Sequence, residues 1–368
     1  MTEDLVPVAR PVIGEAEIAA VVRVLRSGQV VQGAEVAAFE HEFSALVHRR
    51  PCVAVNSGTS ALHLALSALG IGRGDEVIVP SFSFAATGNA VRLAGADPVF
   101  VDIDPRTFCL DPQAAAQAVG ERTAAIMPVH LYGHPAAMDS IVPLARRHGL
   151  AVVEDAAQAH GAALHGTPVG AFGDAAAFSF YPTKNMHSLE GGMVTTPDAD
   201  TARTLRLLRN QGMEQQYCNE IVGHNVRMTD VAAAVGREQL SRLSERNDRR
   251  RASAKALDAG LDGVEGIRLP CEADGAHHVY HQYTVRVAHG KRDALRAELT
   301  RRGIGTGVYY PTPIHRLASF RREADLAHTD QAAAEVLSLP VHPSLTERDL
   351  ERIISGVRDA MATVREAA

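Results

Sequence analysis

The amino-acid sequence predicts an α/β protein, with a large domain built on a mostly parallel sheet and a smaller α+β domain after it. Between residues 53 and 196, short apolar segments alternate with helical stretches such as 60–69 and 138–148. Nearly continuous apolar strands separated by helices are typical of a parallel sheet that is covered on both faces. Near residue 245 the chain changes character, because a highly charged helical stretch replaces this alternation.

The expected elements follow in chain order. Seven apolar segments are predicted to form the large sheet: 53–55, 76–79, 98–101, 124–129, 151–154, 175–180 and 192–195. One long helix is predicted from about residue 229 to residue 261. The smaller domain is expected to hold a strand at 283–287, a helix over 291–302 and a closing helix from residue 346. We predict domains at residues 1–245 and 246–368, with the boundary in the charged helical stretch.

The composition excludes several classes of protein. Of the 368 residues, 46% are hydrophobic and 22% are charged, which is typical of a folded globular chain. The net charge of −6 gives no general attraction to nucleic acid or to an anionic membrane. There is no apolar run of about 18 residues, so no membrane span is expected.

Cysteine usage and the first residues indicate a cytoplasmic protein. The four cysteines are scattered and form no C-x-x-C pair, so neither a disulfide framework nor a zinc ribbon is expected. The chain begins with Met1-Thr2-Glu3-Asp4, which has no features of a secretory signal. We therefore expect a soluble chain in a reducing compartment.

A turn of small residues follows the first predicted strand. The segment Asn56-Ser57-Gly58-Thr59-Ser60 opens an apolar helix. Backbone N–H groups at the start of a helix, next to its positive dipole end, are suited to hold a phosphate. The alternative is an ordinary helix cap. The segment has neither the lysine of a P-loop nor the spacing of a dinucleotide fingerprint, so neither ATP nor NAD is favoured.

Two further polar groups follow predicted strands. Asp155 comes at the end of the strand 151–154, and Lys184 comes shortly after 175–180. Ligands of open α/β sheets bind at the carboxyl ends of the strands. Taken alone, Asp155 is more often a turn cap and Lys184 more often a solvated surface group.

Together these three features predict pyridoxal phosphate as the cofactor. A lysine forms the Schiff base with it. A carboxylate such as that of Asp155 keeps the pyridine nitrogen protonated, so that the ring withdraws electrons. The turn at Asn56 to Ser60, together with Ser179, supplies the phosphate site.

The sequence resembles the DegT/DnrJ/EryC1/StrS family of pyridoxal-phosphate-dependent sugar aminotransferases. The resemblance rests on motifs that occur in the family's order along almost the whole chain. They are Ser27-Gly28 through Gln32-Gly33, Asn56 to Leu62, Pro80 to Thr87, Val129-His130-Leu131-Tyr132-Gly133, Glu154 to Gln158, Phe178 to Asn185, Glu190-Gly191-Gly192, Gly223 to Met228, and Tyr310-Pro311 with His315. The resemblance implies the fold-type-I architecture of these transferases.

The resemblance also implies a role for each matching residue. Lys184 is expected to be the Schiff-base residue and the proton shuttle, and Asp155 to face the pyridinium nitrogen. The other expected cofactor contacts are Gln158 at the phenolic oxygen, Phe84 on the ring, and Gly58, Thr59, Ser179 and a partner subunit's Asn225 at the phosphate. Tyr309 and His315 are expected to border the sugar site. The implied protein is a homodimer with shared active sites.

One stretch departs from the family pattern and leaves the substrate open. Met186-His187-Ser188-Leu189 stands where many relatives carry small residues and a glycine, so His187 is a further candidate for the substrate site. In the family's dehydratase branch a histidine replaces the Schiff-base lysine, so Lys184 favours amino transfer. The expected substrates are an amino-acid donor, for which L-glutamate is the candidate, and a nucleotide-linked keto sugar.

Three other functions stay open. Two are enzymes on the same scaffold, a deoxysugar dehydratase and an aminotransferase for a cyclitol ketone. The third is a non-catalytic cofactor-binding regulatory protein, which is disfavoured because Lys184, Asp155 and Gln158 are all present. The nucleotide, the aminated carbon and the pathway are not defined by the sequence.

Two clusters of polar residues invite other interpretations. The histidines of His277-His278-Val279-Tyr280-His281 suggest a metal site, but strand alternation would separate neighbours, and we expect no metal. Arg246, Arg249, Arg250 and Arg251 occur with Glu245 and Asp248 on the predicted long helix, and we expect a solvated face there.

Overall fold

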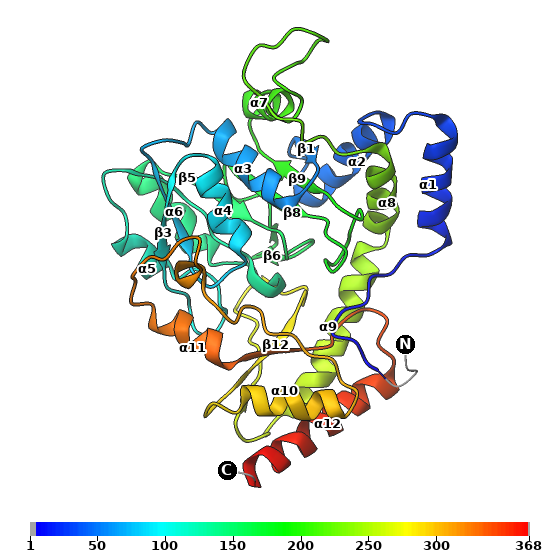
Figure 1. The fold of residues 1–368 in the computed structure, drawn as a ribbon, viewed down its shortest axis with the longest axis vertical. Helices are drawn as coiled ribbons and strands as arrows, with labels where there is room; N and C mark the ends of the chain where they lie inside the picture. The colour runs from blue at the N-terminus through cyan, green and yellow to red at the C-terminus, as the bar shows by residue number, and fades with distance from the viewer. Residues whose placement is uncertain (1–4, 367–368) are drawn as a thin grey trace.

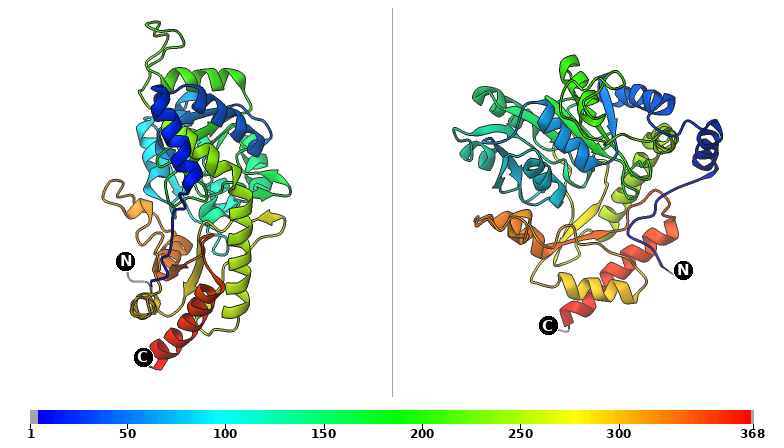
Figure 2. Two further views of the ribbon diagram at one scale, coloured as in Figure 1. Left: turned by 90° about the vertical axis from the view of Figure 1, so that its right-hand side faces the viewer. Right: turned by 45° about the horizontal axis from the view of Figure 1, so that its top comes forward.

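A computed structural model describes residues 5–366 of the chain. Figure 1 shows a large body with a central sheet and a smaller body below it, joined by the long helix α9 (Leu243–Leu261). Both orientations of Figure 2 show the same division, with α9 running from one body to the other. None of the helices within residues 5–366 has the length and apolar character needed to cross a bilayer.

The large body contains a seven-stranded sheet within the described residues. Its strands, in spatial order, are β1 (Cys52–Val55), β9 (Gly192–Thr195), β8 (Ala175–Ser179), β5 (Ala151–Asp155), β4 (Thr123–Ile126), β2 (Glu76–Pro80) and β3 (Asp97–Val101). The pairs from β8 to β3 are parallel, and β9 is antiparallel to both of its neighbours. The prediction of a mostly parallel α/β sheet is confirmed.

Helices cover both faces of this sheet, which explains why its strands are apolar without interruption. Val77 and Val153 pack on one face, in a cluster that includes α3 (Gly58–Ala68), α4 (Ala85–Leu93) and α7 (Ala199–Arg209). Their neighbours Ile78 and Val152 pack on the opposite face, with α5 (Pro112–Gln117) and α6 (Met138–His148). Alternate residues of a strand point to opposite faces, so both sets must be apolar.

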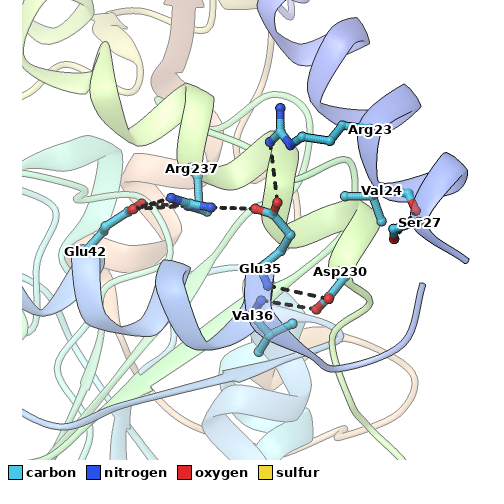
Figure 3. Close-up of polar contacts among 8 residues, drawn as sticks. All are labelled: Arg23, Val24, Ser27, Glu35, Val36, Glu42, Asp230 and Arg237. Atoms are coloured by element: carbon cyan, nitrogen blue, oxygen red, sulfur yellow. Dashed lines mark hydrogen bonds and ion pairs between the residues drawn. The ribbon is translucent and has the colours of Figure 1, made fainter. Parts of the chain in front are cut away.

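The helices α1 (Glu15–Ser27), α2 (Ala34–Ser44) and α8 (Asp230–Ser241) form a layer at one end of the sheet. Asp230 caps α2, because its Oδ1 accepts hydrogen bonds from the N–H groups of Gly33 at 2.7 Å and Val36 at 3.2 Å. In Figure 3, Arg237 of α8 lies between Glu42 and Glu35 of α2. These contacts join α8 to α2 through charge-assisted hydrogen bonds, and the Arg23 Nη2 of α1 donates to the Glu35 Oε1 at 3.4 Å.

The smaller body has a three-stranded antiparallel sheet in the order β10 (Ile267–Arg268), β12 (Tyr283–Val287), β13 (Val336–Leu339). The helices α9, α10 (Arg292–Arg301) and α12 (Glu347–Glu366) pack with it around Tyr283 and Leu337, and α11 (Ala327–Glu335) precedes β13. Val6 belongs to the same apolar cluster and pairs with Ile304, so the N-terminal segment reaches this body.

The remaining elements are short. They are the 3₁₀ turns Ala45–Val47, Leu131–Gly133 and Ile314–Arg316, and a small sheet of β11 (Ala276–His277), β6 (Ala163–Leu164) and β7 (Thr167–Pro168). The small sheet joins segments on either side of α9 in the sequence. The predicted boundary between residues 245 and 246 falls inside α9 and stays a prediction.

Three sequence-based expectations were wrong. The single helix predicted over 229–261 is interrupted at Arg242, which ends α8 with φ −108° and ψ 3° and precedes α9. Arg246 and Arg250 are 7% and 5% exposed, so they do not belong to a solvated face. That face of α9 also carries buried Leu257 and Leu261, and it packs against the rest of the chain. Strand alternation does not apply to the histidine cluster, because β11 ends at His277.

Candidate functional site

The predicted catalytic pair lies at the carboxyl edge of the large sheet. Asp155 ends β5, and Ser179 ends the neighbouring strand β8, with Lys184 five residues further on. Gly58 starts α3 directly after β1, whose carboxyl end lies at the same edge because two antiparallel pairings separate β1 from β8. The fold therefore collects these side chains where open α/β sheets bind ligands.

Asp155 is a buried carboxylate with two hydrogen-bond donors. It is 4% exposed. Its Oδ2 accepts a hydrogen bond from the Thr87 hydroxyl at 2.8 Å, and its Oδ1 accepts one from the Ala157 N–H at 3.2 Å. Burial raises the pKa of Asp155, and both hydrogen bonds and the charge of Lys184 oppose that rise. The carboxylate is thus suited to a cationic partner.

Lys184 is partly buried near this carboxylate. Burial lowers its pKa to about 8, against the opposing effect of the Asp155 charge. An amine with such a pKa is found in both protonation states near neutral pH, so it can accept and return a proton. No hydrogen bond or ion pair formed by its Nζ occurs among the described contacts.

The start of α3 forms an open cradle. The Ser57 hydroxyl caps the helix by accepting a hydrogen bond from the Ser60 N–H at 3.1 Å. Gly58 and Thr59 are the first two residues of the helix, where backbone N–H groups have no partner inside the helix. A Cβ on Gly58 would lie 2.7 Å from the Cβ of Ser179, so only glycine permits this approach. The cradle offers N–H groups and a hydroxyl to an anion.

Aromatic side chains flank the same edge. The Phe84 side chain is 58% exposed, and its ring lies 5.7 Å from that of Tyr310. The Gln158 Nε2 donates a hydrogen bond to the Tyr310 hydroxyl at 3.0 Å, while its Oε1 accepts one from the Tyr132 N–H at 2.8 Å. A segment after β12 therefore meets the residues that follow β5.

The predicted substrate residues lie in two places. The Tyr309 carbonyl accepts a hydrogen bond from the Tyr132 hydroxyl, which brings its segment against the large body. His315 is buried, and its Nδ1 lies 2.7 Å from the Ser81 hydroxyl. His187 is also buried, but its Nε2 lies 3.4 Å from the Val12 carbonyl and it lines a different cavity with Lys184.

Asn225 lies on the surface of its own chain. Its backbone pairs with Asn210 at the base of a loop that extends beyond α7 in Figure 1. The next residue, Val226, accepts a hydrogen bond from the Asn56 N–H at 2.9 Å. Asn225 is thus exposed and close to the end of β1, and its expected contact with a partner subunit stays a prediction.

Sequence reasoning did not assign Thr87, Tyr310 or His130. Each residue lies inside one of the motifs that the chain shares with the family. Their place in these motifs was the sequence signal that could have identified them as site residues. His130 forms a buried pair with Glu154, with Nε2 and Oε2 3.0 Å apart. Burial would raise the pKa of Glu154, but the hydrogen bond and charge of His130 leave it below its ordinary value. The His130 backbone N–H also donates a hydrogen bond to the Asp155 carbonyl at 3.0 Å, so this buried pair supports the end of β5.

The histidine cluster holds no metal-like arrangement. Within residues 5–366, no group of three or more His, Cys, Asp or Glu side chains is placed to bind a metal ion. His278 stacks on Tyr280 with ring centroids 3.9 Å apart, and the His281 Nδ1 lies 3.3 Å from the Asn185 Oδ1. These histidines are part of the packing between the two bodies.

Comparisons with known proteins identify relatives along nearly the whole chain. The model of the DegT/DnrJ/EryC1/StrS aminotransferase family matches residues 11–358. A dTDP-3-amino-3,4,6-trideoxy-alpha-D-glucose transaminase of Streptomyces venezuelae is 46% identical over 354 residues, covering 95% of this chain and 93% of the relative. A pleiotropic regulatory protein of Geobacillus stearothermophilus is 41% identical, covering 91% of this chain and 92% of that protein.

A solved structure has the same fold. The crystal structure of DesV from S. venezuelae in complex with a ketimine intermediate superposes with a TM-score of 0.91 at 46% sequence identity. The similarity covers 94% of each chain. The expected fold-type-I transferase architecture is therefore confirmed.

Proposed function

The chain belongs to the DegT/DnrJ/EryC1/StrS aminotransferase family, and we propose that it transfers the amino group of L-glutamate to a nucleotide-linked keto sugar. As a member of this family it is a pyridoxal-phosphate-dependent sugar aminotransferase of amino-sugar biosynthesis. One observation supports the residue assignment. Buried Asp155 lies near Lys184, whose pKa burial lowers to about 8, and both lie at the sheet edge that also holds the cradle at Gly58.

The residues at the sheet edge fit pyridoxal phosphate. The first turn of α3 and Ser179 offer donors for its phosphate, and the close approach at Gly58 leaves that turn free of a side chain. Asp155 suits a protonated ring nitrogen, because a buried carboxylate gains from a cationic partner. The exposed ring of Phe84 suits a flat aromatic neighbour, and Gln158 suits the phenolic oxygen.

When bound, the cofactor supplies an electron sink that stabilises negative charge at the carbon bearing the amino group. The side chains of the protein transfer the proton and hold the reacting groups in place. The Lys184 Nζ accepts a proton from the substrate carbon and returns it, since its lowered pKa permits both states. Asp155 in its ionised form keeps a proton on the ring nitrogen, and Thr87 holds the Asp155 carboxylate in place.

The proposed sugar is a dTDP-linked 3-keto deoxyhexose, because the 46% identical relative is named for a dTDP-3-amino sugar. Tyr309, His315 and His187 are the proposed substrate contacts. We further propose a cytoplasmic homodimer in which Asn225 completes the phosphate site of the partner subunit. The name of the 41% identical regulatory relative keeps a non-catalytic role as the alternative.

The test is an amino-transfer assay. Purified protein is incubated with L-glutamate and a panel of nucleotide-linked keto sugars and cyclitol ketones, and the release of 2-oxoglutarate is measured. We expect release that depends on a keto sugar and is abolished in Lys184→Ala. Sugar consumption without 2-oxoglutarate would indicate the dehydratase instead, and no turnover with any ketone would support the regulatory alternative.

A further inference from the structure

The side-chain amide of Gln158 belongs to a closed set of hydrogen bonds that joins the two bodies. Its Oε1 accepts a hydrogen bond from the Tyr132 N–H at 2.8 Å, and its Nε2 donates one to the Tyr310 hydroxyl at 3.0 Å. Tyr132 belongs to the 3₁₀ turn after β4, whereas Tyr310 lies between α10 and α11. The Tyr132 hydroxyl donates to the carbonyl of Tyr309, the residue before Tyr310, so the set of contacts closes on itself.

These contacts determine which way the amide points. A backbone N–H can only donate, so the Gln158 atom beside the Tyr132 N–H is the oxygen and the nitrogen faces Tyr310. The Gln158 Nε2 carries two N–H groups, and the Tyr310 hydroxyl accepts one of them. For the second, no acceptor occurs among the hydrogen bonds of residues 5–366. Gln158 is 6% exposed, and a buried donor without a partner is costly, so this N–H is available to a ligand.

Tyr310 is suited to hold the amide in this orientation. Burial raises the pKa of Tyr310, the hydrogen bond from Gln158 opposes the rise, and the charge of Asp155 adds to it. The phenol is therefore neutral at physiological pH and keeps lone pairs with which to accept. Its ring lies 5.7 Å from the ring of Phe84, so the hydroxyl is held at the edge of the sheet where Asp155 lies.

We propose that Tyr310 is a positioning residue for the cofactor and that it acts through Gln158. By accepting one N–H of the amide, it directs the second N–H at the phenolic oxygen of pyridoxal phosphate. The two N–H bonds of an amide point in different directions, so the hydroxyl that accepts one does not take the place of the group that accepts the other. This inference rests on the contact of Gln158 in the proposed function.

The phenolic oxygen gives a readout that does not depend on turnover. A hydrogen bond to the ionised form of a group favours that form. Loss of the N–H donor should therefore raise the pKa of the proton that the phenolic oxygen shares with the lysine nitrogen. The pH midpoint at which the absorbance of the bound cofactor changes should rise with it.

The test measures this midpoint by absorbance of the holoenzyme without substrates between pH 5 and 10. Gln158→Leu removes both N–H groups and should raise the midpoint by about one to two pH units, the effect of a hydrogen bond to a charged group. Tyr310→Phe keeps the ring beside Phe84 and removes only the hydroxyl. It should raise the midpoint by about 0.5–1 unit, the effect of a neutral hydrogen bond.

The double variant tests whether Tyr310 acts through Gln158. With both substitutions the midpoint should equal that of Gln158→Leu alone, because no N–H remains for the hydroxyl to direct. Additive shifts would overturn the proposal, since Tyr310 would then act independently of the amide. A wild-type midpoint in Tyr310→Phe would overturn it as well.

Tyr283→Phe is the matched control for the loss of a buried hydroxyl. The Tyr283 hydroxyl donates to the Asp258 Oδ1 at 2.7 Å, between β12 and α9. We expect this variant to unfold at a lower temperature and to keep the wild-type midpoint, whereas a shift equal to that of Tyr310→Phe would refute a specific role. Thermal unfolding identifies a variant that has lost its fold. If Gln158→Leu is one, the comparison of Tyr310→Phe with Tyr283→Phe decides the proposal.

Failure of this inference is distinct from failure of the proposed function. Wild-type protein that releases 2-oxoglutarate with a keto sugar, while Tyr310→Phe keeps the wild-type midpoint, refutes only the positioning role. Wild-type protein that turns over no ketone refutes the proposed function, whatever the midpoints of the variants.

Discussion

Thr87 is expected to set the pH range in which the enzyme works, because its hydroxyl holds Asp155 in the ionised form. The hydrogen bond is 2.8 Å long, and both residues are buried. Thr87→Val keeps the shape of the side chain and removes the donor. A hydrogen bond to a charged group contributes about 1.5–3 kcal/mol, and 1.36 kcal/mol corresponds to about one pKa unit. The pKa of Asp155 should therefore rise by about one to two units.

The sign follows from the form of Asp155 that acts. In the proposed mechanism the ionised carboxylate is required, so activity is expected to fall as the pH drops through the pKa of Asp155. A higher pKa in Thr87→Val moves the acidic limb of the pH–rate profile upward by the same one to two units. The assay is the rate of the glutamate half-reaction between pH 5 and 9.

A matched variant tests whether the effect belongs to Thr87. The Ser83 hydroxyl lies 2.9 Å from the Thr87 hydroxyl, and no hydrogen bond between Ser83 and Asp155 occurs in the part of the chain that the structure describes. Ser83→Ala should move the acidic limb by less than Thr87→Val. If Thr87→Val is folded, carries its cofactor and keeps the wild-type acidic limb, then Asp155 does not depend on this hydrogen bond.

Four other predictions address the catalytic pair, the assembly and the fold. Lys184→Ala should lose turnover and still bind cofactor, because the phosphate cradle is separate from the lysine; bound cofactor is measured by absorbance after gel filtration. In wild type, borohydride reduction and peptide mapping should find the cofactor on Lys184. Label on another lysine would contradict the assignment. Asp155→Asn should slow both half-reactions by about a hundredfold or more, the usual cost of removing a positioned electrostatic group, and wild-type rates in both would reject its role. Mixing Lys184→Ala with Asn225→Ala should restore activity, because one site of each mixed dimer then has neither defect; stable mixed dimers that stay inactive would argue against shared sites. Asp230→Ala should lower the free energy of unfolding by about 0.5–2 kcal/mol in urea titration, through loss of the α2 cap, whereas an unchanged value would mean that water replaces it.

The sequence predicted the sheet and its edge well, for a physical reason. Strands buried on both faces must be apolar throughout, so they stand out from helices, and the end of each strand marks where the edge lies. The position of Asp155 and Lys184 followed from that rule together with the family resemblance. Both residues lie at the carboxyl edge of the sheet.

The prediction for the arginines of α9 was wrong because a charged helical segment was assumed to be exposed to solvent. Arg246 and Arg250 are separated by one helical turn, and Leu257 and Leu261 continue the same buried face. Helical periodicity that includes apolar residues was therefore the signal that could have placed them inside. The pattern within one helix does not show which segments pack against it. Here these segments are the N-terminal segment and the loop after β8.

The contacts of Asn185 explain why the two bodies meet beside Lys184, the proposed Schiff-base residue. Its Nδ2 donates to the Asn247 Oδ1 of α9 at 2.8 Å and to the Val279 carbonyl at 3.0 Å. The Asn247 Nδ2 in turn donates to the His160 carbonyl at 2.8 Å. The residue after Lys184 is thus fixed to the connecting helix and to the segment that leads into β12. A buried amide without its partners is costly, so any movement of the smaller body must keep these bonds or displace the lysine loop with it.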